Sequence, residues 1–79
     1  MINIEFRPDH VTFSDTSDST EYILEFSDEE QYPKGAILAI ARPDDGGWDD
    51  VVLTVNPDIG DVPVALVLWA IDVARGRMA

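Results

Sequence analysis

Hydrophobic and polar residues alternate along the first third of the chain with the period of a half-buried β-strand. The alternation is clearest over residues 21–27, where Tyr22, Leu24 and Phe26 share one side of the predicted strand. Shorter alternations at 2–6 and 10–13 predict two earlier strands or one bent strand. A polar loop at 14–20 separates them from the strand at 21–27, because it offers nothing apolar to bury.

Two apolar runs follow and predict a hairpin. Residues 36–41 are uniformly apolar, which is typical of a strand buried on both faces or of a buried helical segment; Pro43 and the turn after it favour the strand. The second run is rich in β-branched residues. Asp44-Asp45-Gly46-Gly47 between them is a turn signal. The arms of the hairpin are expected at about 36–42 and 50–56.

The last part of the chain is predicted to form a helix over about 62–75. Asp61 is a good N-cap, Pro63 suits a first turn, and Gly76 is a plausible stop. The helix is apolar on nearly all sides, so either loops wrap it or its exposed part packs on a second copy or a partner. The stripe that faces the sheet is expected to contain Leu66, Trp69, Ala70 and Val73.

The order of these elements, strands first and one helix last, predicts an α+β fold. We expect a small antiparallel sheet of four to five strands (about 2–6, 10–13, 21–27, 36–42 and 50–56) packed against the C-terminal helix (about 62–75). With 79 residues there is room for one domain, 1–79, with a marginal core. Hydrophobic residues make up 46% of the chain, which argues against disorder.

Composition also bears on where the protein works. There is no cysteine, so no disulfide or thiolate chemistry is expected. The N-terminus lacks the basic and apolar pattern of a secretory signal, and the longest apolar stretch, Val62 to Ile71, is far short of the roughly 18 residues of a membrane span. The expectation is a soluble cytoplasmic protein, in the host cytoplasm if a phage encodes it, without a membrane partner.

The net charge of the chain bears most strongly on which partners it can bind. Sixteen acidic residues against five basic ones give a formal net charge of −11. Fifteen of the acidic residues lie in 1–61, which carries −12, whereas 62–79 carries +1. Such charge disfavours direct binding to nucleic acid or anionic lipid and favours basic surfaces. The alternative is a generic acidic surface that maintains solubility or reflects salt adaptation.

Candidate chemistry for an enzyme is weak. His10 is the only histidine, and a lone histidine beside a strand end is more often an ordinary surface residue than a catalyst. Pairs of carboxylates are inevitable by chance in so acidic a chain. Gly46-Gly47 lacks the lysine and helix of a phosphate-binding loop. The aspartates around this turn do not fit an EF-hand. We therefore expect no enzyme, no cofactor and no evolved metal site.

Binding is the more promising role. Trp48 lies at the predicted hairpin tip, flanked by aspartates, where it either anchors a partner or folds back over the sheet. Glu21 and Glu25 share one exposed row of their strand. An acidic face of this kind can occupy a groove that is lined with Lys and Arg for phosphates. The candidate partner-binding residues are Glu21, Glu25, Asp28, Glu29, Glu30, Asp44, Asp45, Trp48, Asp49 and Asp50.

In size, charge and lack of motifs the chain resembles the small acidic inhibitor proteins of phages, the anti-CRISPR and anti-restriction class. Glu21 and Glu25, 28–30 and 44–50 carry the resemblance. It implies a non-enzymatic inhibitor, a monomer or weak homodimer, that docks on a basic nucleic-acid-binding effector such as a CRISPR–Cas subunit and excludes DNA or RNA. Alternatives are an immunity protein against a toxin nuclease, and a structural or assembly subunit that uses the apolar helix as its interface.

Overall fold

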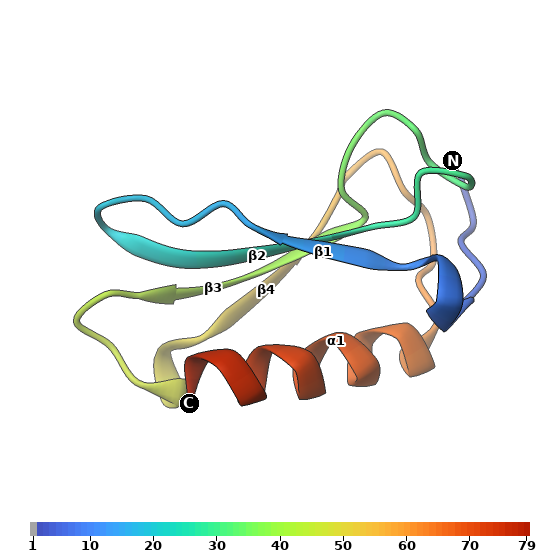
Figure 1. Cartoon of the computed structure of the whole chain (residues 1–79). Helices are drawn as coiled ribbons and strands as arrows, with labels where there is room; N and C mark the ends of the chain where they lie inside the picture. Colours follow the sequence, from blue (N-terminus) through green and yellow to red (C-terminus); the bar gives the residue numbers. More distant parts are fainter. Residues whose placement is uncertain (1) are drawn as a thin grey trace.

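The computed structural model describes residues 2–79 as a four-stranded antiparallel sheet with one helix against one of its faces (Figure 1). The strand order β1-β2-β3-β4 follows the sequence, so each strand pairs with the next. The predicted α+β fold, a small antiparallel sheet backed by a C-terminal helix, is confirmed. The elements are η1 (Pro8–His10), β1 (Thr12–Asp15), β2 (Glu21–Ser27), β3 (Leu38–Pro43), η2 (Trp48–Asp50), β4 (Val52–Val55) and α1 (Val64–Met78).

The register of the sheet aligns apolar side chains in rows that face α1. Leu24 of β2 pairs with Ile40 of β3, and Ile40 pairs with Leu53 of β4. Alternate residues of a strand share a face, so Phe26 and Leu38, which also pair, extend the same layer. Leu24, Phe26, Leu38 and Ile40 are fully buried. Burial of this layer against α1 stabilises the fold through the hydrophobic effect.

The helix packs on the sheet through residues at four-residue spacing. Leu66, Ala70, Ala74 and Met78 are its buried residues. Leu66 and Ala70 belong to the predicted stripe, but the stripe is rotated, so that Trp69 and Val73 are only half-buried. Alanine at two contact positions lets the helix approach the sheet closely. Val64 and Leu68 on the outer side are 72% and 60% exposed, so no loop wraps that side.

The strand predicted at 2–6 does not form, although Ile4 is buried. Among residues 2–79 this segment makes one isolated parallel bridge, between Ile2 and Ile59. The side chain of Gln31 replaces a strand partner: its amide accepts from the Glu5 N–H and donates to the Glu5 carbonyl, both at 2.8 Å. The alternation of apolar and polar residues at 2–6 therefore corresponds to an extended segment that lies over the core and is not a strand of the sheet.

Other boundaries differ because tertiary contacts decide them. The second strand occupies 12–15 rather than 10–13, since Pro8–His10 forms a 3-10 turn, and β4 starts at 52 because Trp48–Asp50 forms another. The helix starts at Val64, where the Pro63 carbonyl accepts from the Leu66 and Val67 N–H groups, so Asp61 is not its N-cap. It also runs through Gly76 to Met78.

The uniformly apolar run of β3 is buried on one face only. Leu38 and Ile40 face the helix, whereas Ala39 and Ala41 lie on the opposite, partly exposed face. Figure 1 shows the helix on a single side of the sheet. We call the other side the open face; its residues on β2 are Glu21, Ile23, Glu25 and Ser27.

Candidate partner-binding surface

Two turns that are distant in sequence lie together at one end of the sheet. The β1–β2 and β3–β4 connections are adjacent because β2 pairs with β3 there, with Glu21 opposite Pro43. The Asp44 N–H donates to the Thr20 carbonyl at 3.0 Å and ties the turns together. We call this region the acidic end, defined by the exposed residues Asp15, Asp18, Glu21, Asp44, Asp45, Asp49 and Asp50.

Local hydrogen bonds fix the β1–β2 turn. One oxygen of Asp18 accepts from the Thr20 N–H, the Thr20 hydroxyl and the Glu21 N–H at 2.7–2.9 Å. Asp15 accepts from the Ser17 N–H at 2.9 Å. These bonds hold the pKa of Asp18, through Thr20 and Glu21, and the pKa of Asp15, through Ser17, below the usual range. Both side chains therefore stay ionised at neutral pH in a defined orientation.

Three arginines at the same end, Arg42, Arg75 and Arg77, have partners within the molecule. The guanidinium of Arg77 lies 4.7 Å from the ring centre of Phe13, and that of Arg42 lies 5.8 Å from Tyr22. Arg42 also donates to the Met78 carbonyl at 3.0 Å, at the negative end of the helix dipole. Sequence reasoning considered the charge of the C-terminal arginines but gave no signal for these aromatic contacts.

Trp48 is half-buried and packs against the core. The guanidinium of Arg75 lies 5.0 Å from the centre of its ring, within cation–π range. Of the two roles considered for Trp48, this geometry favours a ring that folds back over the molecule. Its remaining exposed surface borders the acidic end.

Asp28, Glu29 and Glu30 lie at the other end of the sheet, which we call the N-terminal end. The length of β2 separates them from Glu21 by about 20 Å. Asp28 is 1% exposed and accepts from the Gln31 side-chain amide at 2.6 Å and from the Arg7 guanidinium at 3.4 Å. Burial by itself raises the pKa of Asp28, but the bonds from Gln31 and Arg7 outweigh it and hold the pKa below its usual range.

Glu29 and Glu30 are both exposed, but Glu30 is also bonded within the molecule. The Glu30 carboxylate lies 3.2 Å from Arg7 Nη1 and 3.2 Å from His10 Nδ1. Asp28 is thus closed to a partner in this structure. The sequence positions of Arg7, Asp28 and Gln31 did not predict this hydrogen-bond network, because Arg7 comes close to the other two residues only in the folded chain.

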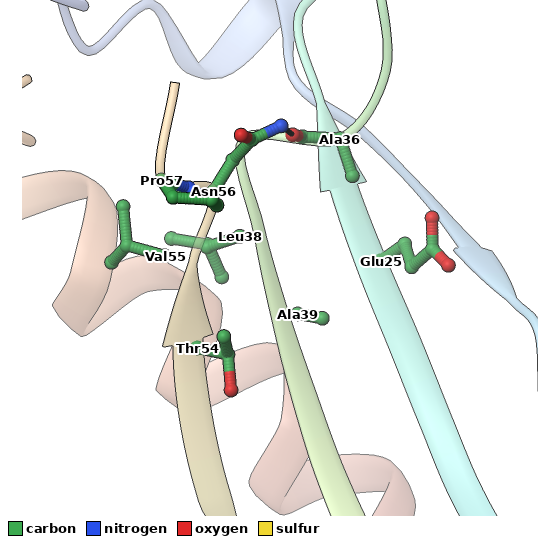
Figure 2. Close-up of a pocket in the computed structure, with 8 residues that line it drawn as sticks. All are labelled: Glu25, Ala36, Leu38, Ala39, Thr54, Val55, Asn56 and Pro57. Atoms are coloured by element: carbon green, nitrogen blue, oxygen red, sulfur yellow. Dashed lines mark hydrogen bonds between the residues drawn. The ribbon is translucent and has the colours of Figure 1, made fainter. Parts of the chain in front are cut away.

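Glu25 lies in the middle of the open face, beside a shallow hollow of about 310 Å³ (Figure 2). Glu25, Ala39 and Thr54 are cross-strand neighbours there, and the Glu25 carboxylate accepts from the Thr16 hydroxyl at 3.2 Å. Among the residues 2–79 that the structure describes, Glu25 is the only charged residue lining the hollow. The lining residues are Glu25, Ala36, Leu38, Ala39, Thr54, Val55, Asn56 and Pro57.

Within residues 2–79, no group of three or more His, Cys, Asp or Glu side chains is arranged to hold a metal ion. None of the helices described is long and apolar enough to cross a membrane.

Comparison with known proteins gives no relative: no family model matches the sequence, and no curated protein and no solved structure matches it. The class that can be stated is therefore structural, a small acidic α+β domain made of a four-stranded meander and one helix.

Proposed function

We propose that the protein is a non-enzymatic inhibitor that binds the Lys- and Arg-lined nucleic-acid-binding site of a protein effector and keeps nucleic acid out. The acidic end is the feature of the structure that supports this proposal. Seven exposed carboxylates lie on one end of a small domain, and local hydrogen bonds hold two of them, Asp15 and Asp18, in place.

Electrostatics supports a basic partner of this kind. The net charge of −11 steers a basic surface toward the protein and repels nucleic acid and anionic lipid. The preformed turns reduce the entropy lost when the carboxylates meet Lys and Arg side chains. The arginines of the acidic end do not cancel this field, since seven carboxylates face three guanidinium groups that lie on aromatic rings.

The test is capture of partners from host lysate by the tagged protein, with stepwise salt elution and competition by a DNA duplex. We expect a nucleic-acid-binding protein that elutes at moderate salt and that the duplex displaces. A matched column carries the Asp44→Lys, Asp45→Lys, Asp49→Lys variant and should retain much less of it. Equal retention on both columns, or a complex indifferent to salt and to the duplex, contradicts the proposal.

The identity of the captured protein separates two members of this class. A CRISPR or restriction effector indicates an inhibitor of defence, and a toxin nuclease indicates an immunity protein. Recovery of only the bait as a salt-resistant oligomer favours an assembly role for the exposed side of α1, where Val64 and Leu68 lie.

A further inference from the structure

β4 is a short edge strand with no charge or proline to protect it. The sheet ends at β4, and among residues 2–79 its backbone pairs only with β3. Edge strands are commonly guarded by charge, proline or a bulge. Val52–Val55 contains neither charge nor proline, and Val52 is 59% exposed. The opposite edge, β1, carries Asp15.

The hydrogen-bond pattern shows which backbone groups are free. The Asn56 N–H donates to the Ile37 carbonyl at 2.8 Å, toward the β3 side. In an antiparallel ladder alternate residues direct their N–H and C=O groups to the same side. Val52 and Thr54 therefore bond to β3, whereas Leu53 and Val55 direct their N–H and C=O groups away from the sheet.

An apolar hollow of about 280 Å³ lies beside this edge, between β4 and the second half of α1. Its one charged group, Arg75, lies over the ring of Trp48. A strand added at the edge would direct every second side chain toward this hollow, because alternate residues share a face. The lining residues are Ile40, Trp48, Val51, Val52, Leu53, Ile71 and Arg75.

We propose that β4 is the docking edge for an extended, basic segment of the partner, which adds to the sheet as a fifth strand. Charge selects this occupant. Asp49 and Asp50 precede the uncharged edge, and Asp58 and Asp61 follow it, all exposed. A second copy of the chain, which also has a net charge of −11, would be repelled by these carboxylates. The segment has apolar residues facing the hollow and Lys or Arg at both ends.

This inference rests on the proposed function, since it takes the partner to be basic, but it is tested separately. The probe is a synthetic peptide of about ten residues, Lys-Lys-Val-Thr-Val-Thr-Val-Thr-Lys-Lys, which has the length and alternation of an added strand. Amide hydrogen exchange of the ¹⁵N-labelled protein is followed by NMR with and without the peptide. We expect the Leu53 and Val55 amides to exchange at least about tenfold more slowly in the complex.

The Val52 and Thr54 amides are the internal control, because β3 already protects them. A saturated complex in which Leu53 and Val55 exchange as fast as in the free protein overturns the inference. Protection of both amides in the free protein that grows with protein concentration also overturns it, because the occupant is then a second copy.

Val55→Pro removes one free N–H and keeps the β3 bonds of Thr54 and Asn56, and proline is tolerated where the N–H faces outward. We expect peptide affinity to fall roughly tenfold, the effect of one lost hydrogen bond, while Val55→Thr keeps it. If Val55→Pro does not fold, the peptide N-methylated at the residues that face β4 gives the same test. Undiminished binding of the methylated peptide overturns strand addition.

A peptide with serine in place of every lysine separates this inference from the proposed function. Weak binding of the serine peptide, together with edge protection by the lysine peptide, supports the inference. If both peptides protect the Leu53 and Val55 amides equally, docking on β4 does not require charge, and the proposal that the docked segment is basic is overturned. Salt-sensitive binding of the lysine peptide without edge protection keeps the basic partner and overturns docking on β4.

Discussion

The two ends of the sheet use the same residue types in different ways. At the N-terminal end, Asp28 and Glu30 are bonded to Arg7, with Asp28 fully buried. At the acidic end, the carboxylates are exposed, and those that accept hydrogen bonds, such as Asp18, bond to groups of their own turn. Both ends carry their carboxylates on turns. They become part of the fold where a segment distant in sequence, here Arg7, packs on the turn, and they remain available to a partner where no such segment bonds to them.

The largest expected effect is on binding at the acidic end. Asp44→Lys, Asp45→Lys and Asp49→Lys together should weaken binding to the captured effector about 100-fold at low salt, because attraction becomes repulsion at three sites. The matched control reverses Glu5, Asp9 and Glu29, three exposed acidic residues of the other end, with the same change in net charge. This control variant should weaken binding to the effector by less than about fivefold. Similar losses by calorimetry for both variants would show that only total charge matters.

The next effect is on stability at the N-terminal end. Asp28→Ala removes the acceptor of two Gln31 bonds and leaves Arg7 with one carboxylate fewer, so we expect a loss of about 2 kcal/mol in the free energy of unfolding. Urea unfolding followed by tryptophan fluorescence measures it. Glu29→Ala, an exposed neighbour, should stay within about 0.5 kcal/mol. A neutral Asp28→Ala would mean that the network does not stabilise the fold.

The Asp28 contribution should depend on pH. The folded pKa of Asp28 lies below the ordinary value of 3.8, so its stabilisation is complete above that value and is lost as pH falls through the folded pKa. The difference in unfolding free energy between the native protein and Asp28→Ala should therefore be constant from neutral pH to about 5 and shrink below 3.8. A difference that grows on acidification would contradict the assigned direction.

The smallest effect concerns the contact of Arg75 with Trp48. Arg75→Gln keeps much of the chain length but removes the cation, and we expect a loss of about 0.5 kcal/mol together with a change in Trp48 emission. Trp69→Phe isolates the Trp48 signal for this measurement. Asp72→Asn, on the same helix, is the control. An unchanged spectrum would place the Trp48 ring away from Arg75.

The sequence predicted the sheet and the helix because their signals are local: alternation in β2, the turn at 44–47 and the apolar C-terminal run. It could not show that residues 2–6 bond to Gln31 instead of a strand, since the partner is 26 positions away. Likewise, Gly76 does not end α1, because burial of Met78 and the bond from Arg42 to its carbonyl hold the last turn.

The candidate site was predicted in part. The residues Glu21, Asp44, Asp45, Asp49 and Asp50 come together because two hairpin turns share one end of a meander. Asp28 was grouped with them by charge alone, and its burial became visible only with Arg7 and Gln31 in place. The sequence gives the number of carboxylates. Whether each carboxylate is available to a partner depends on contacts between segments that are distant in the sequence.

The division of the molecule into a structural end and a binding end is best tested by an NMR titration of the ¹⁵N-labelled protein with the lysine peptide, read as a map of chemical-shift changes. We expect the changes to concentrate at residues 15–21, 44–51 and 58–61 and along β4, while 28–31 stay unperturbed. Changes centred on 28–31, or spread evenly over all exposed carboxylates, would contradict the division of the molecule into a structural end and a binding end.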